Sequence, residues 1–269
     1  MKGKDDGADR IGRRTYLGVA ASAGLAGLAG CTSGTTASAG RAPPKVPKAM
    51  LESGGWEHIG GQTLDPAFEQ SVGPVSVSAA FETLVYEDTA LAAEIKEQTL
   101  GQAEGQFFLF FATRVTLEPS LSNIPKAARG TVVDQIETQA RTQYEAQLKD
   151  VGVTNVEQSG TGSMTVDTGD SARVTEYAAT IPFESITFPF TEEKKFEIEG
   201  REVDVSGLLA VWEHDGTVLV AGGAYPGENF ELDVTKEPTD AISVSVDIDL
   251  GLTPDAYREE LRSIIKAVE

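Results

Sequence analysis

VDVSGLLAVWEHDGTVLVAGG, residues 203–223, is the segment from which the fold class follows. Two apolar runs, residues 203–212 and 217–221, lie on either side of Asp215-Gly216. An Asp-Gly pair between apolar runs favours a two-residue hairpin turn, because both turn positions take a positive φ that these residues tolerate. The segment therefore predicts two antiparallel strands joined at Asp215-Gly216.

The residues after this hairpin predict one more strand and a closing helix. Apolar residues alternate with Ser and Asp over residues 242–250, which is the period of a half-buried strand. Thr253 and Pro254 are then typical of the N-cap and first turn of a helix. The helix would present one apolar stripe to the sheet, made of Tyr257, Leu261, Ile264, Ile265 and Val268.

The residues before the hairpin predict further short strands. Residues 162–166 and 172–181 flank a polar turn at residues 167–170, and residues 195–205 are interrupted at Glu199-Gly200. Short strands separated by such turns are typical of an antiparallel meander.

The first half of the domain predicts two strands with a helix between them. Residues 75–86 alternate as a strand, and Asp88 can cap a helix over residues 89–100 that Gly101 ends. Residues 107–111, FFLFF, are too apolar for a strand with one wet face. We therefore expect them in a central strand covered on both sides.

A long amphipathic helix is predicted over residues 131–150, with Gly152 as its stop. Its opposite face is charged and therefore solvated. The buried stripe would consist of Val133, Ile136, Ala140, Tyr144 and Leu148.

Together these segments predict an α+β domain with a mostly antiparallel β-sheet flanked by helices. The expected order is strand, helix, strand, long helix, four to six antiparallel strands and a final helix. In this order of elements, residues 75–269 are similar to the PsbP/Mog1-like fold. That resemblance implies an α-β-α sandwich, and it implies no particular activity because one fold hosts many chemistries.

The first 30 residues resemble a twin-arginine (Tat) signal peptide. Basic residues including Arg13 and Arg14 precede an apolar stretch of roughly 15 residues, which is the layout of a secretory leader. The segment Gly12-Arg13-Arg14-Thr15-Tyr16-Leu17 is similar to the twin-arginine consensus. A transmembrane helix needs about 20 apolar residues, so this stretch is too short to span a bilayer.

Leu28-Ala29-Gly30-Cys31 resembles a lipobox, which implies that the Cys31 thiol carries a lipid after the leader is removed. Cys31 is the single cysteine of the chain, so an intramolecular disulfide is excluded. We expect residues 1–30 to be the signal peptide, residues 31–48 a lipidated cysteine with a flexible tether, and residues 49–269 one globular domain. The expected location is extracytoplasmic, on the outer face of the cell membrane.

The chain is strongly acidic. Its net charge is −20, and residues 31–269 carry 17 basic and 39 acidic side chains, a net charge of −22. Such charge is self-repelling at low ionic strength and is screened in about 1 M salt, where the Debye length is about 3 Å. The composition therefore favours a halophile, with an ordinary acidic bacterial lipoprotein as the alternative. Nucleic acid is not an expected partner, because no basic patch can meet its phosphates. Leader and acidity together resemble the haloarchaeal twin-arginine-exported lipoproteins of unknown function.

The two histidines, His58 and His214, are too few for a zinc site built on histidine, and Cys31 is assigned to the lipid. Glu213-His214-Asp215 could place a base beside a carboxylate, but polar residues are also expected at a hairpin tip for turn chemistry alone.

Two acidic pairs leave a calcium site and a solvated surface as alternatives. Asp247 and Asp249 point to one face of their strand, and Asp167 and Asp170 flank a glycine in a turn. Gly222-Gly223 would allow either a close approach of a ligand or a bend. For the large aromatic residues we expect burial rather than ligand stacking: Trp56, Trp212, Tyr225 and Phe230.

The sequence carries no nucleophile elbow, no phosphate-binding loop and no dinucleotide fingerprint, so we predict no catalytic residue, no metal and no cofactor. The first hypothesis is a non-enzymatic binding or assembly module whose partners are the membrane, the Tat translocase during export, and an unknown protein or small molecule. The alternative is a carboxylate- or metal-dependent hydrolase at the cell surface. A transporter's solute receptor is disfavoured, because the chain lacks two βαβ-rich lobes.

Overall fold

The computed structural model describes residues 42–72, 75–99, 101, 103, 105–183, 185–189, 195–239 and 242–269. The predicted export residues Arg13 and Arg14, the predicted lipidation residue Cys31 and most of the predicted tether lie outside these ranges.

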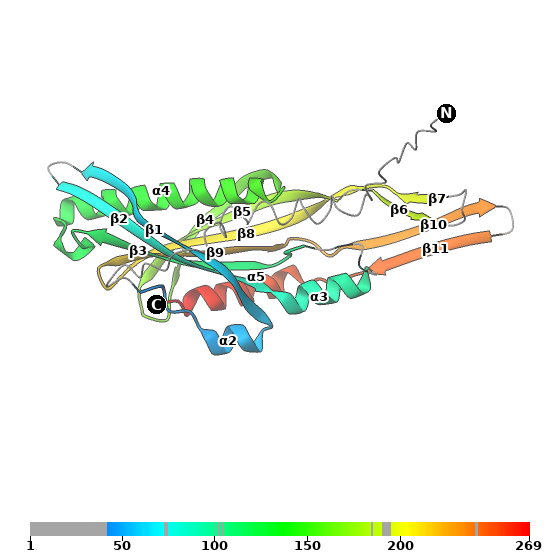
Figure 1. Cartoon of the computed structure of the whole chain (residues 1–269), viewed down its shortest axis with the longest axis horizontal. Helices are drawn as coiled ribbons and strands as arrows, with labels where there is room; N and C mark the ends of the chain where they lie inside the picture. The colour runs from blue at the N-terminus through cyan, green and yellow to red at the C-terminus, as the bar shows by residue number, and fades with distance from the viewer. Residues whose placement is uncertain are drawn as a thin grey trace, which may run out of the picture.

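A seven-stranded antiparallel sheet forms the body of the molecule (Figure 1), in the order β1-β2-β3-β9-β8-β5-β4. Its strands are β1 (Trp56–Val72), β2 (Val75–Asp88), β3 (Leu109–Glu118), β4 (Thr154–Thr165), β5 (Ser171–Phe183), β8 (Arg201–His214) and β9 (Thr217–Pro226). Helices accompany it on both sides: α2 (Lys48–Ser53), α3 (Thr89–Gln98), α4 (Lys126–Asp150) and α5 (Pro254–Lys266), with a short 3-10 turn, η2 (Leu121–Asn123). The predicted α+β class with a mostly antiparallel sheet is confirmed.

The β8–β9 hairpin lies in the interior of the sheet, with β3 and β5 on its two sides. The pair His214 and Thr217 closes it around Asp215 (φ 47°) and Gly216 (φ 75°). Two positive φ angles define the twist-matched turn that an Asp-Gly pair favours. The hairpin prediction is confirmed.

Helix α4 covers one face of the sheet. Its buried side chains are Val132, Val133, Ile136, Tyr144 and Leu148. They pack on the odd-numbered residues of β8, such as Leu209 and Val211, and on the even-numbered Val218 and Val220 of β9. The helix begins at Lys126, five residues before the predicted start, because Pro125 occupies its N-cap position.

Helices α5, α3 and α2 cover the other face. Four of the five residues of the stripe predicted for the final helix are buried there, with Leu261, Ile264, Ile265 and Val268 all at 0% exposure, and Tyr257 is half-buried. Asp88 caps α3 as predicted, and its carboxylate accepts a hydrogen bond from the Leu91 N–H at 2.9 Å. Helix α3 ends at Gln98, and Leu100, the last residue predicted for it, lies outside the described residues.

The strand predicted from FFLFF is covered on both sides. Phe108 and Phe110 lie in the core on the α5 face, and Phe111 packs against the core on the α4 face. That prediction is confirmed for β3, which pairs with β2 and β9.

Two ribbons extend the molecule at one end (Figure 1). They are β6 (Ile186–Pro189) with β7 (Lys195–Ile198), and β10 (Glu231–Thr239) with β11 (Ile242–Asp249). The described residues thus hold eight strands after α4, and the prediction of four to six was wrong. We missed β1, β6 and β10, and glycine and proline within β1 (Gly60-Gly61 and Pro66) and Pro238 within β10 break the alternating pattern.

The chain enters the domain at the opposite end from the ribbons. Residues 42–46 approach Arg114 and Glu269, and Arg114 is in register with Leu219, two residues from the hairpin turn. Strand β9 is about 33 Å long and runs from the hairpin turn toward the end of the molecule that carries the ribbons. We call residues 42–46, Glu269 and the β8–β9 turn the entry end. None of the described helices is long and apolar enough to cross a membrane.

Candidate functional site

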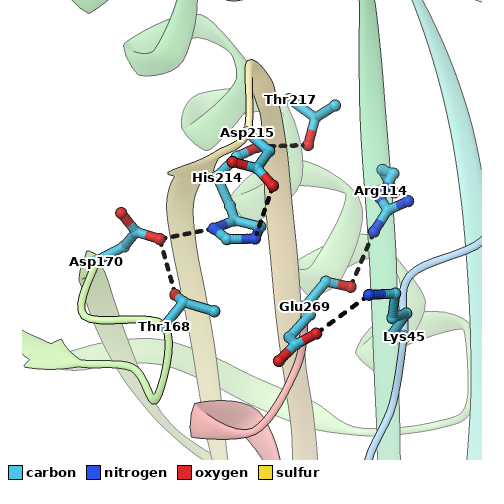
Figure 2. A network of polar contacts seen from close by, with 8 residues as sticks. All are labelled: Lys45, Arg114, Thr168, Asp170, His214, Asp215, Thr217 and Glu269. Carbon is cyan, nitrogen blue, oxygen red and sulfur yellow. Dashed lines mark hydrogen bonds and ion pairs between the residues drawn. The ribbon is translucent and has the colours of Figure 1, made fainter.

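A polar network at the entry end brings together residues that the sequence named separately (Figure 2). His214 lies at the tip of β8, and Asp170 lies 44 positions earlier in the β4–β5 turn. The His214 Nδ1 and Asp170 Oδ2 atoms are 2.8 Å apart. The hydroxyl of Thr168 donates to the same carboxylate oxygen, also at 2.8 Å.

Asp170 is an ionised acceptor in this network. The hydrogen bond from Thr168, followed by that from His214, lowers the pKa of the Asp170 carboxyl below its usual value of 3.8. An ionised carboxylate can only accept hydrogen bonds, so His214 Nδ1 carries the proton between them. The contact therefore ties the hairpin tip to the β4–β5 turn.

The other imidazole nitrogen has a carboxylate as its neighbour. Asp215 Oδ2 lies 3.5 Å from His214 Nε2, and the Asp215 side chain is 91% exposed. Nucleophilic catalysis would need a hydroxyl or thiol within hydrogen-bond distance of this nitrogen. Among the described residues, no hydroxyl lies within hydrogen-bond distance of His214 Nε2. Thr217, the nearest hydroxyl in sequence, instead donates to the His214 main-chain oxygen at 2.8 Å.

A cavity of about 230 Å³ lies beside this network, between β5, β8 and α4. Asp170, Ser171, Arg173 and Glu213 supply its polar lining. Ligand pockets for drug-sized molecules enclose about 300–1,000 Å³, so this hollow is small by comparison.

The Arg173 side chain is paired with two carboxylates of the domain. It donates to Asp134 at 2.5 Å and to Glu137 at 2.9 Å, both on α4. These two hydrogen bonds raise the pKa of the Arg173 guanidinium. Because two carboxylates already occupy the guanidinium, its first role is to hold α4 on the sheet.

A second set of contacts joins the N-terminal and C-terminal residues of the domain (Figure 2). The backbones of Lys45 and Glu269 exchange two hydrogen bonds, at 2.6 and 2.9 Å. Arg114 donates from one side chain to the main-chain oxygens of Ala42 at 3.4 Å and Glu269 at 2.9 Å. Residues 42–48, which we assigned to the tether, therefore contact the domain.

His58 does not share the site of His214. It lies on β1, in register with Tyr86, Phe110 and Gly223 across the sheet, and its ring meets the Tyr86 ring edge-on, with the two ring centroids 5.1 Å apart. Gly223 is six residues from the β8–β9 turn, or about 20 Å along the strand.

One member of the acidic pair on β11, Asp249, has a structural partner. The Asn229 side chain donates to Asp249 at 2.8 Å and to Glu231 at 3.0 Å, and its oxygen accepts from the Leu252 N–H at 2.7 Å. The hydrogen bond from Asn229 lowers the pKa of Asp249. Asn229 thus fastens the base of the β10–β11 ribbon.

Asp247 and Asp167 stand apart from such networks. Asp247 is opposite Asp233 in the ladder and both are exposed, whereas the Asp167 main-chain N–H donates to Lys266. Within the part of the chain that the structure describes, no three His, Cys, Asp or Glu side chains are arranged to hold a metal ion.

The four large aromatic residues are buried, as predicted: Trp56, Trp212, Tyr225 and Phe230. Gly222 and Gly223 do allow close approach, of main-chain oxygens of the neighbouring strands and of core side chains. A Cβ on Gly223 would lie 2.9 Å from Leu261 of α5, and one on Gly222 would lie 3.1 Å from the Phe111 ring.

The contacts that sequence reasoning missed come from residues far apart in the chain. Arg114, Lys45 and Glu269 carry no motif, and the spacing of Arg173 from Asp134 gives no local signal. The polar turn at residues 167–170 was visible, but its pairing with His214 depends on the register of β5 and β8.

Fold and site together define an α+β domain with a helix-covered antiparallel sheet and a polar, cross-linked entry end. The chain belongs to the family described as a domain of unknown function, DUF6517, whose model matches residues 43–269. Comparisons with curated proteins and with solved structures found no match.

Proposed function

We propose that this protein is an extracytoplasmic lipoprotein, exported by the twin-arginine route and held on the outer face of the cell membrane by a lipid on Cys31. The observation that carries the proposal is the leader, where Arg13-Arg14 precedes an apolar stretch that ends at Leu28-Ala29-Gly30-Cys31. The matched family domain begins at residue 43, which leaves a tether of small, mostly polar residues, 32–42, after Cys31.

The entry end is consistent with such an anchor. Two backbone hydrogen bonds and the Arg114 side chain fix residues 42–45 to Glu269. A pull on the tether would be carried by these bonds into β3 and α5. The ribbons would then project away from the membrane, because they lie at the far end of the sheet.

The domain itself is proposed to be a non-enzymatic binding or assembly module. Helices cover both faces of the sheet, and the hollow beside His214 is small and polar. The His214 imidazole lies between two carboxylates, an arrangement that braces a turn. The alternative, a hydrolase, rests on the same His214–Asp170 pair and would need its nucleophile to come from a substrate or a bound water.

The habitat forms part of the proposal. A net charge of −22 on residues 31–269 suits molar salt, where screening removes self-repulsion. Thermal unfolding measured from low salt to about 1 M salt should show a rising melting temperature; a flat or falling response would contradict halophilic adaptation.

The anchor is tested by fractionating cells of a host that has twin-arginine export. The wild-type chain should be found in the membrane fraction and be accessible to external protease. Cys31→Ser should release it from the membrane, and Arg13→Lys with Arg14→Lys should keep it inside the cell. Membrane association of Cys31→Ser equal to wild type would contradict the lipid anchor.

The binding role is tested by a thermal-shift screen in molar salt against divalent metals and small molecules. A melting temperature that rises with ligand concentration identifies a binder. A flat response to every compound would contradict the small-ligand form of the proposal and leave a protein partner as the form to pursue.

A further inference from the structure

The two outer edges of the sheet differ in how well they are guarded. Strand β1 forms one edge and β4 the other. An edge strand exposes main-chain donors and acceptors, and proteins block it with charged residues, proline and bulges. The two strands can therefore be compared feature by feature.

Strand β1 is guarded in all three ways. Its pairing with β2 is irregular between His58 and Gly60 and again between Leu64 and Phe68, and Pro66 lies inside the second irregularity. Three acidic residues, Glu57, Asp65 and Glu69, lie along it. Another strand would meet breaks and negative charge at this edge.

The second half of β4 is unguarded. Residues 160–165, GTGSMT, pair with β5 in six consecutive positions from Gly160–Glu176 to Thr165–Ser171. The six residues include no charge and no proline, and they span about 20 Å. Among the described strands, only β5 pairs with β4.

The glycines of this segment are not required by the domain. Gly162 has no positive φ, and a Cβ built on it would meet no heavy atom within 4 Å. Gly160 would meet only the Glu176 side chain, at an ordinary contact of 3.5 Å. The ladder has a register shift between Gln158 and Gly160, which accounts for a glycine at residue 160. Gly162 lies in the regular part of the strand, where a glycine often marks the close approach of another backbone.

The segment is chemically complementary to itself. In an antiparallel pair centred on Ser163, Thr161 of one copy would lie opposite Thr165 of the other, and the two Ser163 side chains would face each other. The domain already uses such cross-strand hydroxyl pairs: Thr83 with Thr113 at 2.9 Å, and Thr235 with Ser245 at 3.0 Å. Such pairs stabilise a ladder by about 0.2–1 kcal/mol each.

The charge of the chain favours a second copy of it as the partner at the β4 edge. Each chain carries a large negative charge, so two copies repel wherever acidic residues meet. Residues 160–165 form a neutral edge at which two copies can approach without facing carboxylates within the paired segment. We propose that the protein self-associates by antiparallel pairing of β4 with β4 of a second copy, across a two-fold axis at Ser163.

The association is weak in dilute solution. The five residues paired across the axis, 161–165, bury less than the roughly 800 Å² per partner of a standard interface. Salt strengthens it, because screening removes the repulsion between the two acidic bodies. The proposal does not rest on the lipid anchor, and the test therefore removes the anchor.

The test uses the full chain with Cys31→Ser, which excludes both lipid and thiol from residue 31. Sedimentation equilibrium in about 1 M salt should show a monomer–dimer equilibrium that shifts to monomer as the salt is diluted. Ser163→Glu should weaken the dimer at least about tenfold, because two carboxylates would face each other across the axis. Ser163→Thr and, on the guarded edge, Gln62→Glu should leave it unchanged.

Cysteine cross-linking fixes the register in the same Cys31→Ser background. Paired antiparallel residues have Cα atoms about 4.5–5.5 Å apart, within the range of a disulfide. Ser163→Cys should form a disulfide dimer on mild oxidation faster than Thr165→Cys or Gln62→Cys. If Ser163→Glu fails to fold, Thr161→Glu serves in its place, and the cross-linking does not depend on either.

A monomer at every concentration in molar salt would overturn the proposal, and a different protein would then be the candidate partner for the β4 edge. A dimer that survives Ser163→Glu, or equal cross-linking at residues 163 and 62, would also overturn it.

Discussion

The two faces of the sheet are both covered by helices, but they are closed by different chemistry. On the α4 face, a tyrosine packs against the sheet. Tyr144 lies over Gly207, and its hydroxyl donates to the Gly223 main-chain oxygen at 2.7 Å. On the α5 face the closing residues are aliphatic, and Leu261 packs directly over Gly223. One glycine-rich hairpin thus serves both layers. With both faces filled, the surfaces left for partners are the edges, the ends and the ribbons.

The largest expected effect is at Gly223, where both layers meet. A Cβ there would lie 2.0 Å from the Leu109 main-chain oxygen and 2.9 Å from Leu261. Because backbone cannot move aside as a side chain can, Gly223→Ala should lower the free energy of unfolding by about 3 kcal/mol or prevent folding. Denaturant unfolding measures the loss.

The control for Gly223 is Gly162→Ala, whose Cβ would meet nothing within 4 Å. It should leave stability unchanged or slightly raised. Equal losses for the two variants would mean that Gly223 is not a contact point between the layers.

The second effect belongs to the α4 face alone. A Cβ on Gly207 would lie 2.3 Å from the Tyr144 hydroxyl, so Gly207→Ala should displace the ring and cost about 2 kcal/mol. Tyr144→Phe should cost about 1 kcal/mol, because the buried Gly223 oxygen loses its donor.

The double variant Gly207→Ala with Tyr144→Phe shows whether the two residues touch. With Tyr144→Phe in place, the hydroxyl that Gly207→Ala would strike is gone, so the two costs should not add. A double-mutant cycle of unfolding free energies measures the coupling. Full additivity would contradict a direct contact between Gly207 and Tyr144.

These two faces also show what the sequence could predict. The stripes of α4 and α5 were readable because apolar residues recur at helical spacing, and the FFLFF segment indicated a strand covered on both sides. The glycine contacts could not be foreseen, because glycine signals equally a bend, a ligand or a neighbouring side chain. At the candidate site, His214 and Asp170 were both noted, but only the register of β5 and β8 shows that they meet.

On the α5 face, we expect the free energy of unfolding to depend on pH through Glu260. Glu260 of α5 accepts a hydrogen bond from Trp56 at 2.8 Å, and burial raises the pKa of its carboxyl above 4.5, with nearby Asp88 adding to the rise. A raised pKa in the folded state means that the folded state binds more protons, so this group costs stability at neutral pH. The cost disappears as the pH falls through the raised pKa toward 4.5.

Glu260→Gln keeps an acceptor for Trp56 and removes the charge. Relative to wild type it should be equally or more stable at pH 7, with the difference shrinking toward acid pH, as measured by thermal unfolding across pH. Glu259→Gln, on the exposed side of the same helix, is the control and should show no such trend. A gain for Glu260→Gln that grows toward acid pH would contradict the sign of the shift.

The smallest effect is at the hairpin tip, outside both layers. His214→Gln should lose the bond to Asp170 and cost about 1 kcal/mol, because the ring is only partly buried. His58→Gln, on an exposed part of β1, should cost less. A loss of several kcal/mol at His214 would mean that the tip supports the core rather than a surface turn.

The role proposed for the whole protein depends on the anchor more than on either face. Because helices cover both faces of the sheet, the proposed partners would bind at the edges and ribbons, and the tether would determine where those surfaces stand. Residue 31 is therefore the position on which the proposed role depends most.

The most direct measurement is mass spectrometry of the N-terminal peptide of the native, membrane-associated protein. If Cys31 is the anchor, the chain begins at Cys31 and carries a lipid on its thiol. An unmodified Cys31 in membrane-associated protein would contradict it.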